Sequence, residues 1–157
     1  MPQDVERWLA NALFFGAKIE ARMFECYDEL VKRLPKDEFK KQAAAIRTQE
    51  AVHLKISSEI VGGIVANPFL AKEPVFFERG KELEELVGSG YEDLLKPYPK
   101  PVDELLDYCY HAETFYETAY AKLIPRIRIQ QINQGLMQMV SESRAHARIV
   151  GLMRKNL

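Results

Sequence analysis

The chain has 157 residues and an ordinary globular composition, so it is long enough to bury a core and is predicted to form a single domain, residues 1–157. Its 22 basic and 23 acidic residues give a net charge of −1, which offers no electrostatic attraction for nucleic acid or an anionic membrane. No apolar run is long enough to span a bilayer, and the polar, acidic start does not resemble a signal peptide. We therefore expect a cytoplasmic location.

The first half of the chain shows two long helical periodicities and no strand alternation. The first helix is predicted over residues 4–34, with Asp4 as N-cap and Pro35 ending it. The second is predicted over residues 37–65, before Pro68. The inward stripe of the first helix reads Leu13, Gly16, Glu20, Phe24, Tyr27 and Val31. That of the second reads Phe39, Ala43, Ile46, Glu50, His53, Ser57, Ile60 and Ile64.

Residues 67–101 form a connector rich in proline and glycine, with short helices predicted over 74–86 and 91–95. A long third helix follows over 102–124 and a fourth over 126–154, separated near Pro125. Their stripes read Val102, Leu106, Cys109, Glu113, Tyr116, Tyr120 and Leu123, then Ile129, Ile132, Leu136, Met139, Ser143, His146, Val150 and Met153. Two short loops and one long crossover predict two antiparallel hairpins packed as an all-α four-helix bundle.

An internal repeat relates the two hairpins. A shift of 93 positions superposes, without gaps, Glu20 on Glu113, Tyr27 on Tyr120, Leu30 on Leu123, His53 on His146 and Ile56 on Ile149. The first half carries a glutamate on one helix and a Glu50-Ala-Val-His53 segment on the next. Residues three apart on a helix project from one face, so Glu50 and His53 are expected to act together.

Charged residues on inward stripes need a counter-charge, because burying an unpaired ion costs several kcal/mol. The stripes carry few basic residues, and a metal cation would supply the missing charge. Carboxylate and imidazole donors together suit iron, manganese or zinc better than calcium. The predicted ligands are Glu20, Glu50, His53, Glu113 and His146, with Glu142 as a further candidate.

Glu142 is the ambiguous member of this set, because Ser143 stands at the position that corresponds to Glu50. Glu142 lies four residues before His146 and could reach the site if the fourth helix rotated slightly. It could equally face solvent. Both readings remain open from the sequence.

These motifs resemble the ferritin-like superfamily, which includes rubrerythrins, bacterioferritins and related di-iron carboxylate proteins. The resemblance covers residues 4–65 and 102–155, and implies an up-down-down-up bundle, two iron ions and a bridging Glu50. Rubrerythrins carry an additional carboxylate where this chain has Tyr116, with Glu117 beside it. The two cysteines, Cys26 and Cys109, form no Cys-x-x-Cys pair, so no rubredoxin module is present and both are expected to be buried apolar side chains.

Three tyrosines on the inward stripes, Tyr27, Tyr116 and Tyr120, are candidates to donate hydrogen bonds to ligand carboxylates or bound oxygen species; the alternative is a core role. His111 is expected at the surface.

The leading functional expectation is a di-iron oxidase or peroxidase that acts on oxygen or hydrogen peroxide with an unknown electron donor. The alternatives are iron sequestration, a metal-stabilised oligomer, or a degenerate site with one ion near Glu20, Glu50 and His53. A homo-oligomer, with a dimer favoured, is expected to use exposed aromatic residues, namely Phe14, Phe15, Phe76 and Phe77.

Overall fold

The computed structural model describes residues 2–65, 91–126 and 130–157, and within them every regular element is helical. This confirms the predicted all-α class. The elements are α1 (Pro2–Arg33), α2 (Asp37–Val65), α4 (Tyr91–Leu95), α5 (Val102–Leu123), the 3₁₀ turn η1 (Ile124–Arg126) and α6 (Gln130–Asn156).

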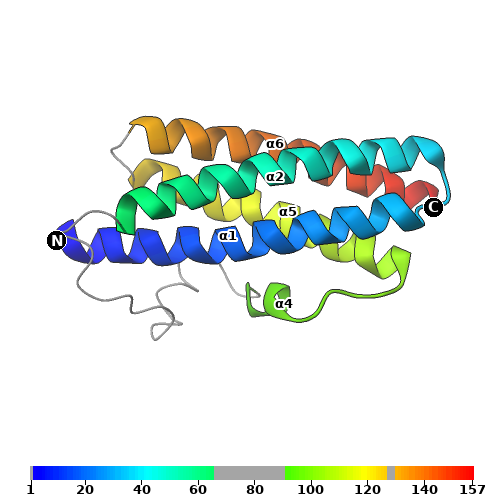
Figure 1. The fold of residues 1–157 in the computed structure, drawn as a ribbon, viewed down its shortest axis with the longest axis horizontal. Coiled ribbons are helices and arrows are strands. Elements are labelled where there is room, and N and C mark those ends of the chain that lie inside the picture. The colour runs from blue at the N-terminus through cyan, green and yellow to red at the C-terminus, as the bar shows by residue number, and fades with distance from the viewer. Residues whose placement is uncertain (1, 66–90, 127–129) are drawn as a thin grey trace.

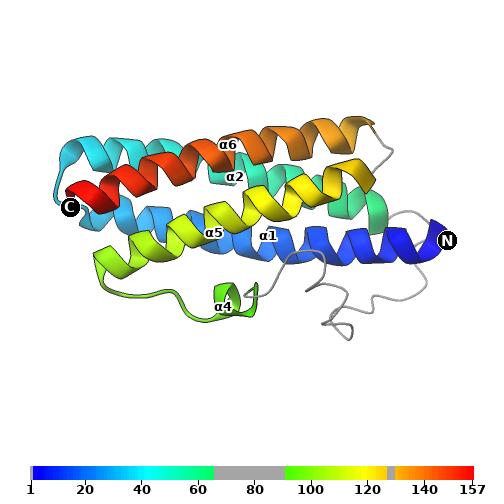
Figure 2. The ribbon, with the colours of Figure 1, turned by 180° about the vertical axis from the view of Figure 1, so that it is seen from behind.

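The four long helices lie side by side as two hairpins (Figure 1). Helices α1 and α2 pack closely along their length, as do α5 and α6, while α1 also contacts α5 and α2 contacts α6. The colour gradient in Figures 1 and 2 shows α1 and α6 running in one direction and α2 and α5 in the other. All four inner faces therefore converge on one central space.

Local sequence explains most of the helix ends. Pro35 follows α1, and Asp37 opens α2 with an acidic first turn that suits the positive end of the helix dipole. Two expectations at helix starts were wrong. Asp4 lies inside α1, which begins at Pro2, because proline suits a first helical position. Arg126 belongs to the 3₁₀ turn, so the described part of α6 begins at Gln130.

The core occupies the space between the hairpins, and the largest fully buried side chains are Tyr27, Tyr116, Tyr120, Ile19, Met23, Leu30, Leu34, Ile46 and Leu105. Cys26 and Cys109 are fully buried, as expected. Phe24 was wrongly placed on the inner stripe: it is 37% exposed, and Met23 takes the inward position. Helix α1 contacts both α2 and α5, so its buried face is wider than one stripe and shifts toward Met23.

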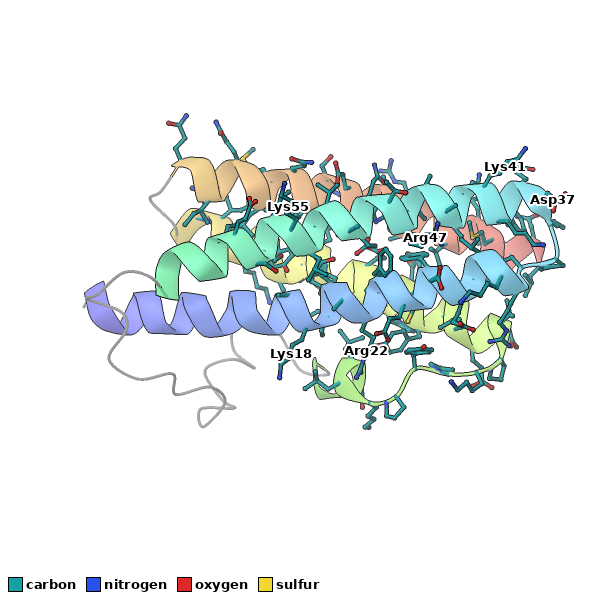
Figure 3. The ribbon with its side chains drawn as sticks, viewed as in Figure 1. Lys18, Arg22, Asp37, Lys41, Arg47 and Lys55 are labelled. Atoms are coloured by element: carbon teal, nitrogen blue, oxygen red, sulfur yellow. The ribbon has the colours of Figure 1, made fainter. Side chains whose placement is uncertain are left out.

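The short helix α4, which matches the prediction for residues 91–95, is held against α1 and α5. The Arg22 guanidinium donates hydrogen bonds to the carbonyl oxygens of Leu94 and Lys96, each at 2.6 Å. The Tyr108 hydroxyl donates to the Leu94 carbonyl at 2.7 Å. Figure 3 shows Arg22 pointing toward α4. The predicted helix over 74–86, with Phe76 and Phe77, lies outside the described residues, as do the side chains of Phe14 and Phe15.

Basic side chains lie on the outside of the bundle. Lys41 and Lys55 project away from α2 in Figure 3. Arg47 of α2 forms an ion pair with Asp28 of α1 at 2.6 Å. His111 is exposed on α5, as predicted. Within the described ranges, none of the helices combines the length and apolarity needed to cross a membrane.

Candidate metal centre

Five buried acidic and histidine side chains meet between the four long helices. They are Glu20 from α1, Glu50 and His53 from α2, Glu113 from α5 and His146 from α6, and each is at most 1% exposed. Their inward positions are as the sequence predicted. All four long helices therefore contribute donors to one level of the bundle.

The donor atoms form two groups that share one glutamate. Site A comprises Glu20, Glu50 and His53, and site B comprises Glu50, Glu113 and His146; within each group the donor atoms lie within 4.8 Å of one another. In site A, His53 Nδ1 is 3.6 Å from Glu20 Oε2 and 3.7 Å from Glu50 Oε1. In site B, His146 Nδ1 is 2.9 Å from Glu50 Oε1 and 3.3 Å from Glu113 Oε1. Glu50 Oε1 thus faces both histidines.

Most of these donor atoms lack a hydrogen bond despite their burial. Both Glu20 oxygens, Glu50 Oε1, Glu113 Oε2 and the Nδ1 atoms of His53 and His146 have no partner with hydrogen-bond geometry. No lysine or arginine is among the buried side chains that the structure describes. Buried polar atoms are normally satisfied, so a group of close but unbonded donors is the arrangement that could hold a metal ion.

The carboxylates have strongly perturbed affinities for protons. Burial, reinforced by the nearby Glu50 charge, holds the pKa of Glu20 well above its usual range and raises the pKa of Glu113 to about 7. Burial also works to raise the pKa of Glu50, but contacts with His146, His53 and Glu20 outweigh it and hold that pKa below its usual range. Glu50 is therefore ionised at neutral pH.

The histidines respond to the same charges in the opposite direction. Burial works to lower their pKa values, but the carboxylates of Glu20 and Glu50 raise the pKa of His53 to about 11. Glu113 and Glu50 similarly raise the pKa of His146 to about 9. Without metal, both rings are therefore protonated at neutral pH, and protons supply the positive charge that the carboxylates need.

The outer nitrogens of the two rings are also occupied. His53 Nε2 is 2.5 Å from Glu142 Oε2, and His146 Nε2 is 2.6 Å from Gln49 Oε1. These contacts leave Nδ1 of each ring as the atom that faces the carboxylates. An imidazole held in this way is oriented to bind a metal through its inner nitrogen.

Glu142 belongs to neither site A nor site B. Its carboxylate reaches the far side of His53, so the structure places it behind the ring and not among the inward donors. The reason is helix geometry: Glu142 precedes Ser143 by one residue and is rotated by about 100° from the inner stripe. Ser143 itself is buried, with a hydroxyl that makes no hydrogen bond.

Gln49 is a site residue that the sequence analysis missed. The signal was available, because the shift of 93 positions places Gln49 on Glu142. The two residues occupy equivalent places in the repeat and perform equivalent contacts. Because Ser143 stands at the position that corresponds to Glu50, the sequence suggested Glu142 as a displaced ligand. Its contact with His53 instead corresponds to the contact of Gln49 with His146.

The three tyrosines differ in their contacts. Tyr27 donates a hydrogen bond to Glu113 Oε1 at 2.7 Å, so it touches site B. Tyr116 donates to the Gly16 carbonyl at 2.6 Å and so links α5 to α1. The Tyr120 hydroxyl makes no hydrogen bond to Glu20 and lies close against Gly16, where a Cβ would overlap it. Only Tyr27 among them bonds to a predicted ligand.

The donor spacing suits first-row divalent ions. Two ligands about 2.1 Å from one ion and roughly 90–125° apart lie about 3.0–3.7 Å from each other. Three of the four nitrogen–oxygen distances, 3.3, 3.6 and 3.7 Å, lie in this range, and the fourth, 2.9 Å, lies just below it. Three glutamates and two histidines are also a donor set suited to iron, manganese or zinc. The residues present therefore fit a pair of metal ions that share Glu50.

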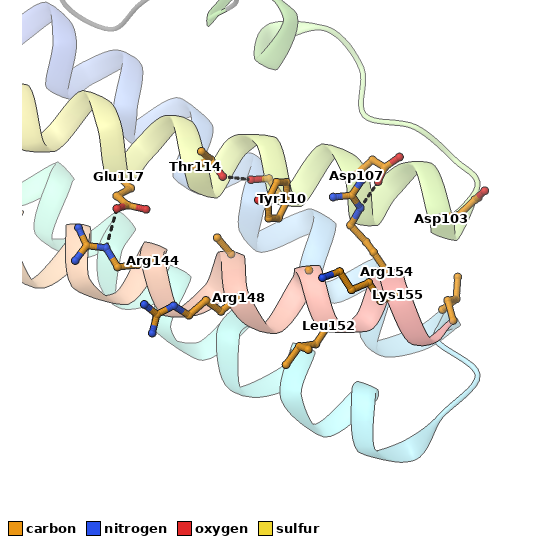
Figure 4. A pocket seen from close by; sticks show the side chains of 13 residues that line it. Asp103, Asp107, Tyr110, Thr114, Glu117, Arg144, Arg148, Leu152, Arg154 and Lys155 are labelled. Atoms are coloured by element: carbon orange, nitrogen blue, oxygen red, sulfur yellow. Dashed lines mark hydrogen bonds and ion pairs between the residues drawn. The ribbon is translucent and has the colours of Figure 1, made fainter.

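A separate open groove of about 970 Å³ lies on the outer side of α5 and α6. Ion pairs cross it between Arg144 and Glu117, at 2.7 Å, and between Arg154 and Asp107 (Figure 4). None of its lining residues belongs to site A or site B. The groove is therefore distinct from the buried centre.

Comparisons of the chain with protein-family models, with curated proteins and with solved structures found no match.

Proposed function

We propose that this chain is a ferritin-like di-metal carboxylate protein in which sites A and B each hold one iron ion and Glu50 bridges the two. The observation that carries the proposal is the pair of three-donor groups that share the fully buried Glu50. A structural ion-pair network would be expected to include a lysine or arginine, and none is among the described buried residues. Manganese or zinc would satisfy the same donors.

The arrangement of the helices supports the ferritin-like part of the proposal. Two antiparallel hairpins, opposite directions for α1 and α2 and for α5 and α6, and one long connection are what that resemblance implies. The glutamates of α1 and α5, and the Glu50–His53 pair of α2, project inward as in carboxylate-bridged bundles. Helix α6 departs from the pattern at Ser143.

We propose further that the loaded protein is an oxidase or peroxidase that reduces oxygen or hydrogen peroxide. Bound iron supplies the redox chemistry, and the protein sets the geometry and access around it. Glu20, Glu50 and Glu113 balance the positive charge, and Tyr27 fixes the orientation of Glu113 through its hydroxyl. Burial of all five donors keeps bulk water from the reacting centre.

The first test is metal content. Protein purified without chelators is expected to contain about two iron ions per chain, and Glu50→Gln is expected to remove both because it belongs to both groups. The matched control is Glu59→Gln, the same substitution on the same helix at a side chain that is 67% exposed. Absence of near-stoichiometric iron, manganese or zinc from the wild-type protein would overturn the proposal.

The second test is reactivity. Optical spectra of the iron-loaded protein, recorded before and after peroxide, should change in the wild type and in Glu59→Gln but not in Glu50→Gln. Continued consumption of peroxide that requires an added electron donor would indicate peroxidase activity, and consumption of oxygen as ferrous iron is oxidised would indicate oxidase activity.

One alternative has a specific observation in its favour. Ser143 offers no carboxylate on α6, which is the basis for a degenerate centre with a single ion at site A. That alternative predicts one ion per chain, and metal analysis decides between the two. A large iron-filled shell in solution would instead favour iron sequestration, and a dimer would disfavour it.

A further inference from the structure

The two buried histidines are held from behind by residues of different charge. Glu142 Oε2 lies 2.5 Å from His53 Nε2, whereas Gln49 Oε1 lies 2.6 Å from His146 Nε2. The distances are alike and the two residues are repeat equivalents, 93 positions apart. One accepts the imidazole N–H with a carboxylate, and the other with a neutral amide oxygen.

Each contact crosses between the hairpins. Glu142 of α6 reaches His53 of α2, and Gln49 of α2 reaches His146 of α6. The second oxygen of Glu142 accepts a hydrogen bond from Gln138 Nε2 at 3.1 Å, which fixes the carboxylate in place. Both rings are therefore oriented by the opposite hairpin, with Nδ1 directed toward the shared Glu50.

A carboxylate behind a histidine strengthens that histidine as a ligand. The N–H···carboxylate bond makes the inner nitrogen a better electron donor, and the negative charge attracts the cation directly. An amide oxygen gives the same orientation without the charge.

We propose that Glu142 and Gln49 are positioning residues that make the two metal positions unequal, so that a divalent cation fills site A before site B. This inference rests on the proposed metal-binding function. It gives a role to Glu142, which lies beside the position where a second Glu-x-x-His motif would have its glutamate. Removal of partners behind metal-binding histidines typically changes affinity by about 10–100-fold, and we expect a separation of that order between the two sites.

The chain offers a reciprocal pair of substitutions as the test. Glu142→Gln gives both histidines an amide, Gln49→Glu gives both a carboxylate, and the double variant exchanges them. Gln49 is exposed and the Glu142 side chain is 25% exposed, so these changes do not create a cavity in the core. Glu59→Gln again controls for the loss of one negative charge on the surface.

Calorimetric titration of Zn²⁺ into the metal-free protein at fixed pH gives the two dissociation constants. The wild type and Glu59→Gln should show two steps about 10–100-fold apart. Glu142→Gln should weaken the first step until the two merge, and Gln49→Glu should strengthen the second. Anomalous diffraction from crystals with one equivalent of Zn²⁺ should place the ion beside His53 in the wild type and beside His146 in the double variant.

The outcomes separate this inference from the proposed function. If the wild-type protein binds no Zn²⁺, Mn²⁺ or Fe²⁺, the metal-binding function itself fails. If it binds two ions with equal affinity, or if the reciprocal substitutions change neither constant, the positioning role of Glu142 and Gln49 is overturned. A first ion beside His146 in the wild type would overturn the predicted order.

Discussion

Loading of sites A and B with divalent ions is expected to release at least about 2.5 protons at pH 7, because histidine and carboxylate ligands bind metal only in their unprotonated forms. His53 and His146, with pKa values of about 11 and about 9, each carry a proton to be displaced. Burial and the Glu50 charge hold the pKa of Glu20 well above its usual range, so any proton released from Glu20 adds to this number. Glu113, with a pKa of about 7, contributes roughly half of one.

Isothermal titration of Zn²⁺ into metal-free protein measures this number. The titration is repeated at one pH in buffers with different ionisation enthalpies. The apparent binding enthalpy is plotted against the ionisation enthalpy of the buffer, and the slope of this line gives the number of protons released. A slope of at least about 2.5 is expected at pH 7. At pH 6 it should rise by about 0.4, because Glu113 is then almost fully protonated in the metal-free state.

A slope near zero would refute the reasoning, since it would mean that the buried histidines are already neutral or that they do not bind the ion. A slope near one would indicate that only one histidine loses its proton, which would contradict loading of both sites. Tightening of the apparent affinity with increasing pH must accompany the release, because protons and metal compete for the same atoms.

Three further predictions concern stability. The metal-free protein should lose stability as pH rises from 7 to 9. A histidine whose pKa is raised on folding stabilises the folded state fully below the ordinary histidine pKa of 6.5. This stabilisation declines as the pH rises, until it is lost above about 9 for His146 and about 11 for His53. Each extra proton bound by the folded state contributes about 1.4 kcal/mol per pH unit, so urea titrations across this window should show a decline of up to about 5 kcal/mol, absent in the metal-loaded protein. Gly16→Ala should destabilise by about 1–3 kcal/mol because its Cβ overlaps the Tyr120 hydroxyl, and Tyr120→Phe should recover part of the loss. The control Gly62→Ala meets nothing within 4 Å and should stabilise by up to about 1 kcal/mol; equal effects at the two glycines would contradict the packing argument. Ser143→Glu should lower the thermal midpoint of the metal-free protein, since it buries a further carboxylate, and should enlarge the upward shift on adding Zn²⁺. An unchanged metal response would mean that position 143 does not face the ions.

The helices and the inward donors could be predicted from the sequence because both follow from periodicity. Glu50 and His53 lie three apart, and the repeat fixes the partners on the other hairpin. The width of a buried face does not follow in the same way. A helix packed against two neighbours buries more than one stripe, which is why Met23, and not Phe24, lies in the core.

The contacts behind the histidines were harder to predict, because they join different hairpins at the edge of the buried zone. Gln49 is exposed and carries no charge, so neither burial nor electrostatics distinguishes it in the sequence. The shift of 93 positions identifies Gln49 only when Glu142 is known to contact a histidine. In the case of Tyr120 the repeat predicts too much. It places Tyr120 at the position that corresponds to Tyr27, but only Tyr27 forms a hydrogen bond with a glutamate.

Charge balance connects the change at Ser143 to the position of Glu142. Glu20, Glu50 and Glu113 supply three negative charges to the centre, one fewer than two divalent ions require. Glu142 supplies the fourth from behind His53, at 2.5 Å from its outer nitrogen. The centre thus has four carboxylates in total, and the one from α6 lies on the far side of His53 instead of on the inner face of the helix. The glutamate at position 142 therefore compensates in charge for the serine at position 143, and its place behind His53 makes site A the more negative of the two sites.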